Sequence, residues 1–412
     1  MSQSNARHAT SAALALVLAG GRGSRLHDLT SALAKPALPV GDVGRLIDFT
    51  LANVANSGIP RALVLTQYEP DALHRHLNQT WQRFGGIELD VLDGNECGPF
   101  NGTADAVVKI SDQIDQEAPD HVVVLAGDHL YQMDYRPFIE RHMLSNAKVT
   151  VGAVHVPLAD ADQFGVMTAG ADGLITDFAE KPASPAEAPD RPGHAFASMG
   201  IYVFTWQLLR QVLAELAPLH EDLDFGKHVL PRLVAQRGAY VYALPGRGQA
   251  APLWRDLGTV DAYHGIHADI ASGRVALDPS WPVAGRRAIG LPVRSAPVSD
   301  RPAWPGHMIG QGASVGERAQ LRNVVVMPGA RVGSDVRIDN AIVTGDAVIP
   351  DGFDLSEALR QCGDGCLVSE GGIRLLSAQA MSRLAGAKRS AKPYPAYTSS
   401  DESGRRMLAP GL

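Results

Sequence analysis

The chain has 412 residues, of which 45% are hydrophobic and 20% are charged, and its formal net charge at pH 7 is −7. These values are typical of a globular protein with two or three domains, and the negative charge argues against a nucleic-acid-binding protein, which usually carries a basic face. No apolar run approaches the roughly 18 residues of a membrane-spanning helix, and residues 1–13 are too polar for a signal peptide, so we expect a cytoplasmic protein without nucleic-acid or membrane partners.

The first strong signal along the chain is an apolar strand that runs into a glycine-rich turn. Residues 14–19 are Leu, Ala and Val only, which predicts a strand buried on both faces, as in a parallel sheet. The turn that follows contains Gly20, Gly21 and Gly23. Its backbone N–H groups can approach an anion, and Arg25 and Lys35 add positive charge, so we predict a phosphate site at the carboxyl end of this strand. The spacing matches neither G-x-G-x-x-G nor the P-loop, and a glycine-rich turn without a ligand is the alternative interpretation.

The region from residue 14 to about residue 270 alternates short apolar runs with longer mixed segments. Further buried strands are predicted at residues 62–66, 121–126, 149–154, 175–179 and 200–204, and helices at residues 69–84, 103–116 and 134–145. This alternation predicts a Rossmann-like, doubly wound and mostly parallel α/β sheet over residues 14–270, preceded by an N-terminal arm at residues 1–13. On the first of these helices His74 and His76 share a polar face, and we expect solvent to be their partner.

After a proline-rich stretch at residues 271–306, which predicts a linker, the sequence takes up a six-residue period. The aliphatic residues that carry this period are Ile309, Val315 and Leu321, then Val326, Val332 and Ile338, then Val343 and Ile349. The period predicts a short left-handed parallel β-helix at residues 307–385, and an ordinary β-meander is the alternative. Because the period slips by one at two places, we expect irregular corners, and so few coils must dock on another part of the chain. The polar tail at residues 386–412 is expected to be disordered.

Two aspartates are candidates for a metal site. Asp128 follows the apolar run 121–126, which places it at the carboxyl edge of the sheet, and Asp256 lies in the segment 254–259, far along the chain. If they meet around a phosphate, their carboxylates can bind Mg²⁺, which neutralises charge on a transferring group. A helix cap or a turn is the alternative role for each. The three cysteines, Cys97, Cys362 and Cys366, do not make a disulfide framework, and we expect free thiols.

Two further pairs of residues lie beside predicted elements. Glu180 and Lys181 follow the strand at 175–179, where Lys181 can reach a phosphate and Glu180 can accept hydrogen bonds from sugar hydroxyls; an exposed ion pair is the alternative. Gly102 and Thr103 open a predicted helix, whose free N–H groups could meet a base or a phosphate. The sequence has neither a G-x-S-x-G nor an H-E-x-x-H motif, but an ionised sugar phosphate is itself a nucleophile and requires neither.

Taken together, these motifs resemble the nucleotidyltransferases that join a sugar 1-phosphate to a nucleoside triphosphate, and within that group the bacterial ADP-glucose pyrophosphorylases (glucose-1-phosphate adenylyltransferases). The segments that carry the resemblance are LVLAGGRGSRL (16–26), AKPALPVG (34–41), RLIDFTLANVANSGI (45–59), TQYEPDAL (66–73), GTADAV (102–107), VVLAGDHLYQMDY (123–135), FGVM (164–167), EKPA (180–183), ASMGIYVF (197–204), DFGKHVLP (224–231) and WRDLGTVDAY (254–263). They span the whole first domain, and the domain with the six-residue period fits the same family.

The resemblance implies a nucleotidyltransferase fold and the conversion of ATP and α-D-glucose 1-phosphate into ADP-glucose and pyrophosphate, for glycogen or α-glucan synthesis. It implies in-line attack of the sugar phosphate on the α-phosphorus, with Arg25, Lys35 and Asp128 as catalytic residues and with Mg²⁺ held by Asp128 and Asp256. The residues implied for nucleotide binding are Gly20, Gly21, Gly23, Gln67, Gly102 and Thr103, and those implied for glucose 1-phosphate are Gly165, Glu180, Lys181 and Ser198. Members of the family are usually homotetramers.

The sequence departs from the family pattern at three places. Phe100 and Asn101 stand where the family usually has Tyr-Arg before GTADA, which alters contacts next to the site. Residues 32–33 and 115–116 stand where many allosteric relatives have basic residues, so we expect regulation by anions such as sugar bisphosphates or AMP to be absent or rewired. Two alternatives remain open: a related enzyme for another sugar phosphate or nucleotide, and a non-catalytic regulatory paralogue. The paralogue would be expected to lose the charged site residues, which are all present.

Overall fold

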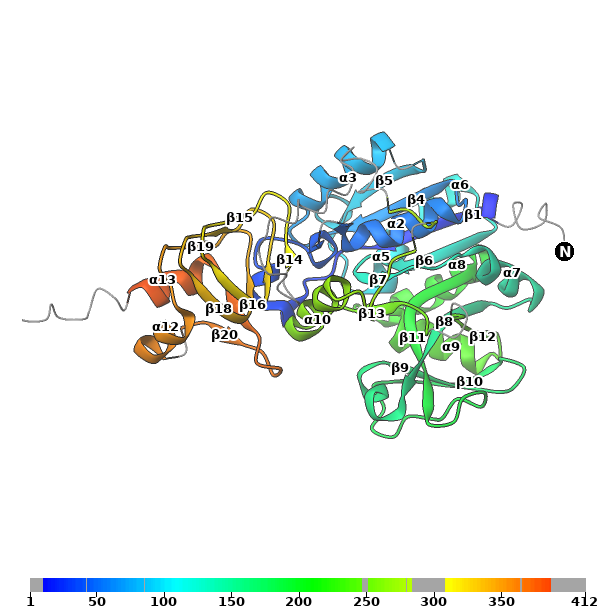
Figure 1. The fold of residues 1–412 in the computed structure, drawn as a ribbon. Coiled ribbons are helices and arrows are strands. Elements are labelled where there is room, and N and C mark those ends of the chain that lie inside the picture. The colour runs from blue at the N-terminus through cyan, green and yellow to red at the C-terminus, as the bar shows by residue number, and fades with distance from the viewer. Residues whose placement is uncertain are drawn as a thin grey trace, which may run out of the picture.

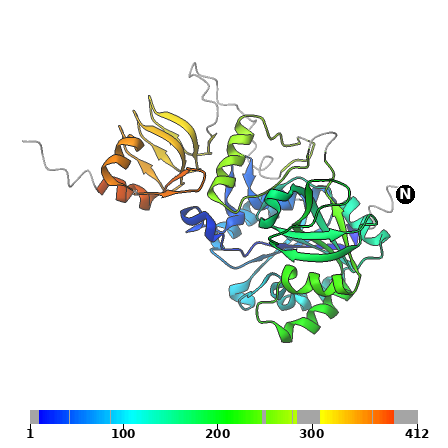
Figure 2. The ribbon, with the colours of Figure 1, turned by 90° about the horizontal axis from the view of Figure 1, so that it is seen from below.

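The computed structural model describes residues 10–41, 43–84, 86–246, 251–278, 280–283, 308–363 and 365–386. A twisted sheet with helices on both faces forms the larger part of the structure, and a β-helix lies at one end of it (Figures 1 and 2). Residues 1–9 of the predicted arm, residues 284–306 of the predicted linker and residues 387–412 of the predicted tail lie outside the described residues.

One side of the main sheet consists of four parallel strands, β1 (Ala13–Leu18), β4 (Arg61–Thr66), β5 (Glu88–Asp93) and β6 (His121–Ala126), with β5 at the edge. The sheet continues through β11 (His194–Thr205), which pairs with β6, β8 (Val149–Pro157) and β9 (Gly165–Ala169), and it ends with β10 (Ile175–Glu180) beside β9 and β12 (Ala239–Ala243) beside β8. Strand β11 is antiparallel to all three of its partners. The predicted Rossmann-like sheet is therefore confirmed, with a mixed part around β11, because an apolar run indicates a buried strand but not its direction.

Alternate residues of β1 belong to two separate hydrophobic cores. Leu16 lies in one core and Val17 in the other, and both are fully buried. The Val17 core is covered by α2 (Leu46–Asn56), α3 (Asp71–Phe84), α7 (Arg136–Leu144) and α10 (Val260–Ala271), and the Leu16 core by α5 (Thr103–Lys109), α6 (Ser111–Glu117), α8 (Trp206–Leu216) and α9 (Leu230–Ala235). Helices on both faces explain why the strand is apolar at every position.

Short elements connect these layers: β2 (Pro39–Val40), β3 (Gly44–Arg45), α4 (Gly94–Cys97), and the antiparallel pair β7 (His129–Tyr131) and β13 (Trp254–Asp256). The helix predicted at residues 103–116 is in fact two helices, α5 and α6, which meet at Ile110. The hydroxyl of Ser111 donates to the carbonyls of Val107 (3.0 Å) and Val108 (2.7 Å), and such bonding competes with a continuous helical ladder.

The prediction that His74 and His76 face solvent is wrong. Nε2 of His74 lies 2.7 Å from the hydroxyl of Thr66, and Nε2 of His76 lies 2.6 Å from Oδ1 of Asp48. Asp48 is fully buried in α2, where it also accepts hydrogen bonds from the Trp81 indole (2.8 Å) and from the backbone N–H three residues before it (2.7 Å). The polar face of α3 therefore covers a buried carboxylate, which the periodicity of one helix does not reveal.

The six-residue period folds as a parallel β-helix, so the meander alternative is excluded. Its strands are β14 (Met308–Ile309), β15 (Ser314–Val315), β16 (Gln320–Val326), β17 (Arg331–Val332), β18 (Arg337–Val343) and β19 (Val348–Ile349), followed by α12 (Leu355–Cys362), β20 (Leu367–Val368), β21 (Arg374–Leu376) and α13 (Ala378–Gly386). From β14 to β19, residues 17 apart stack on each other, as Leu321 does on Ile338, so these coils are one residue shorter than three full hexads. The missing residue explains the two slips in the period.

One corner of two successive coils carries an asparagine in the left-handed backbone region. Asn323 has φ 55° and Asn340 has φ 49°, and the amide of Asn323 donates to that of Asn340 over 2.8 Å. Asparagine tolerates this conformation better than most residues do, because its short side chain bonds locally. The irregular corners that the sequence predicted are therefore turns stabilised by stacked amides.

The β-helix docks on the larger domain through apolar and polar contacts. Val325, Ile342 and Leu375 belong to the same hydrophobic core as Val17 of β1. At the rim, Nε2 of His264 on α10 lies 3.0 Å from the carbonyl of Asn323. The short solenoid is thus stabilised by burial against its neighbour, as its few coils require.

A buried histidine under the sheet predicts a pH-dependent stability. His142 is 1% exposed and bonds through Nδ1 to Thr150 (3.0 Å) and through Nε2 to Thr205 (3.1 Å). Burial, and next the neighbouring His121, lower the pKa of His142 from 6.5 to about 3. The fold binds the neutral ring, so this contribution is complete above the unfolded pKa of 6.5 and is lost as the pH falls toward 3.

Between about pH 7 and pH 5 we expect His142 to reduce the free energy of unfolding by about 2 kcal/mol. The measurement is urea unfolding of the wild type and of His142→Gln, an uncharged residue that can still donate and accept a hydrogen bond. The wild type should lose more stability than the variant over this range. Equal pH dependence in the two proteins would contradict the assignment.

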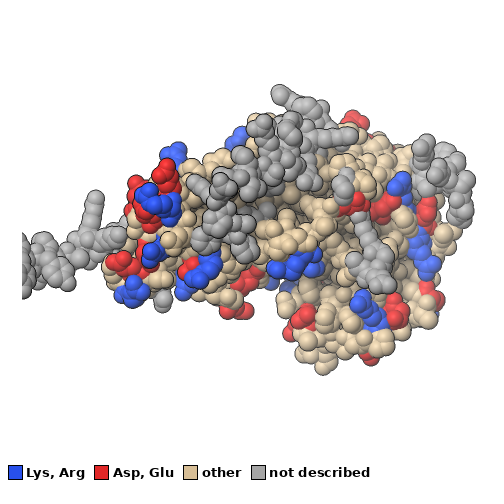
Figure 3. All heavy atoms as spheres, viewed as in Figure 1, with Lys and Arg blue, Asp and Glu red and all other residues tan. Residues whose placement is uncertain are grey.

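No helix in the described part of the chain combines the length and the apolar character needed to cross a membrane. On the face of the molecule in Figure 3, basic and acidic side chains are interspersed over both domains.

Candidate functional site

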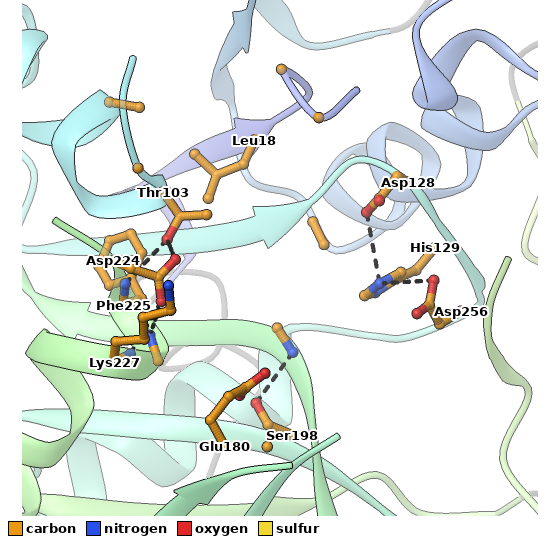
Figure 4. A pocket seen from close by; sticks show the side chains of 18 of the residues that line it. Leu18, Thr103, Asp128, His129, Glu180, Ser198, Asp224, Phe225, Lys227 and Asp256 are labelled. Atoms are coloured by element: carbon orange, nitrogen blue, oxygen red, sulfur yellow. Dashed lines mark hydrogen bonds and ion pairs between the residues drawn. The ribbon is translucent and has the colours of Figure 1, made fainter. Parts of the chain in front are cut away.

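A cavity of about 580 Å³ opens at the carboxyl end of the parallel strands, and it brings together residues from distant parts of the chain (Figure 4). The site residues predicted from the sequence that line it are Gly20, Gly21, Arg25, Gln67, Gly102, Thr103, Asp128, Gly165, Glu180, Lys181, Ser198 and Asp256. Gly23 and Lys35 are not among the lining residues, and both lie directly behind it. The structure therefore places the predicted residues in one site.

The three glycines of the turn after β1 have different surroundings. A Cβ on Gly21 would meet nothing within 4 Å, so its backbone is open to a ligand. Gly23 has φ 62°, and a Cβ there would lie 3.1 Å from Cβ of Lys35 and 3.2 Å from the methyl group of Thr30. Glycine is therefore required at position 23 for the turn itself, since the left-handed conformation and the close neighbours both disfavour a side chain.

At one end of the cavity the two predicted metal ligands meet around a lysine. Nζ of Lys35 lies 2.9 Å from Oδ2 of Asp128 and 2.8 Å from Oδ1 of Asp256. Burial acts to lower the pKa of Lys35, but the two carboxylates more than compensate, so the pKa is raised and the side chain is charged. Burial likewise acts to raise the pKa of Asp128, but His129 and Lys35 hold it below its usual value.

These carboxylates fit a divalent cation. Asp128 and Asp256 both approach a single cationic nitrogen to within 3 Å, so they are close enough to share one ion, and carboxylate oxygens are the ligands that Mg²⁺ prefers. Among the described residues no cluster of three or more His, Cys, Asp or Glu side chains could hold a metal. Two carboxylates with water and substrate phosphates as the remaining ligands are a usual magnesium arrangement.

Arg25 and His129 complete this end of the cavity. The Arg25 side chain is 66% exposed, and its guanidinium lies 4.0 Å from Oδ2 of Asp256, so it is free to turn toward an anion. Nε2 of His129 lies 3.7 Å from Asp128 and 3.8 Å from Asp256. Its ring packs edge-on against Trp254, which holds it between the two carboxylates. The sequence contains no signal for His129 beyond its position directly after Asp128.

The predicted nucleotide-binding residues at the opposite end are held by neighbouring loops. The side-chain amide of Gln67 donates to the carbonyl of Phe100 over 3.2 Å and accepts a bond from the N–H of the same residue. The hydroxyl of Thr103 donates to Asp224 (2.8 Å) and accepts from the N–H of Phe225 (3.1 Å). Both side chains thus hold the walls of the cavity in place.

The expectation that the first turn of α5 offers free N–H groups is wrong for two of them. The N–H groups of Ala104 (3.0 Å) and Asp105 (2.9 Å) both donate to the carbonyl of Leu223. A Cβ on Gly102 would lie 2.2 Å from that carbonyl oxygen, so glycine is required there for the approach of the two segments. The capping group comes from residues more than a hundred positions along the chain, which a local pattern cannot indicate.

Three of the predicted sugar-phosphate residues lie on β9, β10 and β11, and Lys181 directly follows β10. Nζ of Lys181 is 3.7 Å from Glu180, and both side chains are exposed to the cavity. Lys181 has φ 50°, an unfavourable conformation for a residue with a Cβ, and its N–H donates to the carbonyl of Phe164 (2.9 Å). Glycine is favoured at position 165 beside it, because a Cβ there would lie 2.6 Å from Cζ of Phe178.

Several cavity residues had no role assigned from the sequence. These are His129, Tyr202, Asp224, Phe225 and Lys227. The last three lie in the segment DFGKHVLP, which carried the resemblance as a motif without an assigned function. Asp224 caps the following turn by accepting bonds from the N–H groups of Gly226 (2.8 Å) and Lys227 (3.1 Å), and this places Lys227 at the cavity wall.

Comparison with known proteins agrees with this geometry. A family model described as nucleotidyl transferase matches residues 14–273, and one described as GlmU-like, C-terminal hexapeptide matches residues 306–376. The second match agrees with the left-handed β-helix predicted from the six-residue period. Nucleotidyltransferases of this kind generally use a divalent metal.

Individual relatives are similar over most of their length. The glucose-1-phosphate adenylyltransferase of Jannaschia sp. (strain CCS1) is 36% identical in an alignment that covers 92% of this chain and 99% of that protein. The protein of the same name from Roseobacter denitrificans is 37% identical, with 84% of this chain and 90% of the relative covered. That of Agrobacterium fabrum is 38% identical, with the same coverage of 84% and 90%.

Proposed function

Because this chain belongs to the nucleotidyl transferase family, and within it to the glucose-1-phosphate adenylyltransferases, we propose that it converts ATP and α-D-glucose 1-phosphate into ADP-glucose and pyrophosphate. One observation carries most of the support: the open glycine turn, the carboxylate pair and the Glu180–Lys181 pair all line a single cavity. A triphosphate and a sugar phosphate can react only where the groups that bind each of them face the same cavity.

The reaction forms a bond between a phosphate oxygen of the sugar and the α-phosphorus of ATP. The bond from that phosphorus to the bridging oxygen breaks, and pyrophosphate leaves with the electron pair. In our proposal Lys181 binds the phosphate of glucose 1-phosphate, and Glu180 accepts hydrogen bonds from the hydroxyls of the sugar ring. Gly21 presents its backbone to the triphosphate, and Arg25 binds the departing pyrophosphate. Positioning and charge neutralisation are sufficient here, because the nucleophile is already ionised.

We propose Mg²⁺ as the divalent cation and Asp128 and Asp256 as its protein ligands. When bound, the cation would neutralise charge on the phosphate oxygens of the nucleotide. The short distances from both carboxylates to one cationic nitrogen support this assignment.

The decisive experiment measures pyrophosphate release from ATP and glucose 1-phosphate in the presence of Mg²⁺. A panel of sugar phosphates (glucose, glucosamine and mannose 1-phosphate) and nucleotides (ATP, UTP and GTP) provides the comparison through kcat/KM. We expect ATP with glucose 1-phosphate to have the highest value. A higher value for another pair would change the substrate assignment, and absence of turnover with every pair would favour a non-catalytic paralogue.

The resemblance also implies a homotetramer and a cytoplasmic location, and we include both in the proposal. The location agrees with the substrates, because ATP and sugar phosphates are cytoplasmic metabolites. Light scattering coupled to size-exclusion chromatography tests the tetramer.

Anionic effectors are expected to have little influence on this protein. A second cavity of about 540 Å³ lies between the domains and is lined by residues 32–33, and Arg45 is the one Lys or Arg among its described lining residues. The Arg45 guanidinium already donates to the carbonyl of Ala37 (2.9 Å). On α6, Asp115 accepts bonds from the Trp206 indole (2.8 Å) and from Arg210 (3.2 Å), so this acidic residue is part of the packing.

We therefore expect fructose 1,6-bisphosphate and AMP to change kcat/KM less than about twofold, because each missing charge-assisted contact is worth about 1.5–3 kcal/mol of binding. The assay is pyrophosphate release with and without each compound, and sodium sulfate at matched ionic strength is the control. Activation of tenfold or more would show that other residues bind the effector.

A further inference from the structure

Lys35 occupies the space between the two carboxylates that a divalent cation would need. Its side chain is 6% exposed, and its Nζ atom bonds to Asp128 and Asp256 over 2.9 and 2.8 Å. Mg²⁺ binds carboxylate oxygens at about 2.0–2.1 Å. The ammonium group and the cation would thus compete for the same oxygens and repel each other if both were present.

The stem of Lys35 begins beside the turn that is proposed for the triphosphate. Its Cβ lies 3.1 Å from the position that a Cβ on Gly23 would take. The backbone of Lys35 is restrained by the short 3₁₀ turn Lys35–Ala37, which contains Pro36, but the four-carbon side chain can rotate. An ammonium group that leaves the carboxylates is therefore within reach of an anion bound on the glycine turn.

We propose that Lys35 is an exchangeable internal cation: it holds Asp128 and Asp256 together in the free protein, and it transfers to the phosphates when the metal and the nucleotide enter. The inference rests on the proposed function and adds a second position for this side chain. Without nucleotide, a metal ion would displace a buried ammonium group that has no other anion to bind, which is unfavourable. With nucleotide, the phosphates accept the ammonium group. Metal and nucleotide consequently bind together, and the metal does not bind first.

The test measures Mn²⁺ binding to the protein without nucleotide, from the electron paramagnetic resonance signal of free Mn²⁺. The wild type should bind Mn²⁺ weakly. Lys35→Met should bind one Mn²⁺ ion at least about tenfold more tightly, because two carboxylates are then left without their cation. The gain should disappear in the double variant Lys35→Met with Asp256→Asn. Lys35→Arg, which keeps the charge, should bind as weakly as the wild type.

Lys227→Met is the matched control, since Lys227 lines the same cavity and its side chain makes no ion pair within the described part of the chain. Removing that charge should leave Mn²⁺ affinity unchanged. Equal affinities for wild type and Lys35→Met, or an equal gain in Lys227→Met, would overturn the proposal.

If Lys35→Met does not fold, the wild type and the variant Lys35→Gln decide the question. A Kd of about 10 μM or less for Mn²⁺ alone, at a site lost in Asp256→Asn, would overturn the proposal, and a much weaker affinity that rises at least tenfold in the neutral but hydrogen-bonding variant Lys35→Gln would support it. Pyrophosphate release by the wild type separates a failure of this inference from a failure of the proposed function. If the wild type is active but its Mn²⁺ affinity does not depend on Lys35, only this inference is refuted.

Discussion

Replacing Asp128 with asparagine is expected to lower kcat for pyrophosphate release by about a thousandfold or more. The carboxylate lies 2.9 Å from Lys35 and lines the cavity together with Asp256, so it is in position to bind a cation on the phosphates. Asparagine has nearly the same shape but no charge, and it leaves a single carboxylate for the metal. We also expect the variant to need more Mg²⁺ than the wild type for its residual activity.

Asp134→Asn is the matched control for this experiment. Asp134 lies six residues further along the same segment, and its carboxylate bonds to Arg136 outside the cavity. This variant should keep the kcat of the wild type, and both variants should retain the circular dichroism spectrum of the wild type. A loss of less than tenfold in Asp128→Asn would refute the role of this residue as a metal ligand.

Replacing Asp48 with alanine is expected to reduce the free energy of unfolding by about 3–5 kcal/mol, although this residue lines the second cavity and not the one proposed for the substrates. Asp48 is fully buried and accepts bonds from His76 (2.6 Å), from the Trp81 indole (2.8 Å) and from the backbone N–H of Arg45 (2.7 Å). Its removal leaves the buried Trp81 indole and two partly buried donors without their acceptor and also opens a small void between α2 and α3.

The measurement is urea unfolding followed by fluorescence, with Asp190→Ala as the control. Asp190 also pairs with a histidine, His155, over 3.0 Å, but its side chain is 56% exposed, so water replaces the lost contact. The control should unfold close to the wild type. A similar small effect for Asp48→Ala would mean that the site relaxes and that water reaches the three donors.

Local patterns in the sequence predicted those elements well whose structure follows from the hydrophobic pattern of neighbouring residues. The apolar run 14–19 became β1, and the six-residue period became the β-helix, because both patterns report which residues face a hydrophobic core. The same logic failed where partners come from other elements. The sequence predicted that His76 on α3 faces solvent, because the pattern of α3 alone does not show that His76 contacts Asp48 on α2.

The candidate site divides in the same way. Motif and resemblance named Asp128, Asp256 and Lys35, and the structure brings the three together. The direct contact of Lys35 with the two carboxylates was not predictable, since Lys35 and Asp256 are 221 positions apart and either could have bound a ligand alone. Gln67 was named for the nucleotide, yet its amide bonds to the backbone of Phe100, a contact that depends on the path of an intervening loop.

The sequence by itself predicted the runs that form β1, β4, β6, β8, β10 and part of β11, the coil period and the types of charged groups at the site, because each of these follows from neighbours along the chain. It did not predict β5, β9 or β12. Only the tertiary structure decided the antiparallel direction of β11, the closure of α5 by the carbonyl of Leu223 and the placement of Lys35 between two carboxylates. These features depend on which distant segments meet. Charge and hydrogen bonding act through space over a few ångströms, so their outcome is set when the sheet and its loops are assembled.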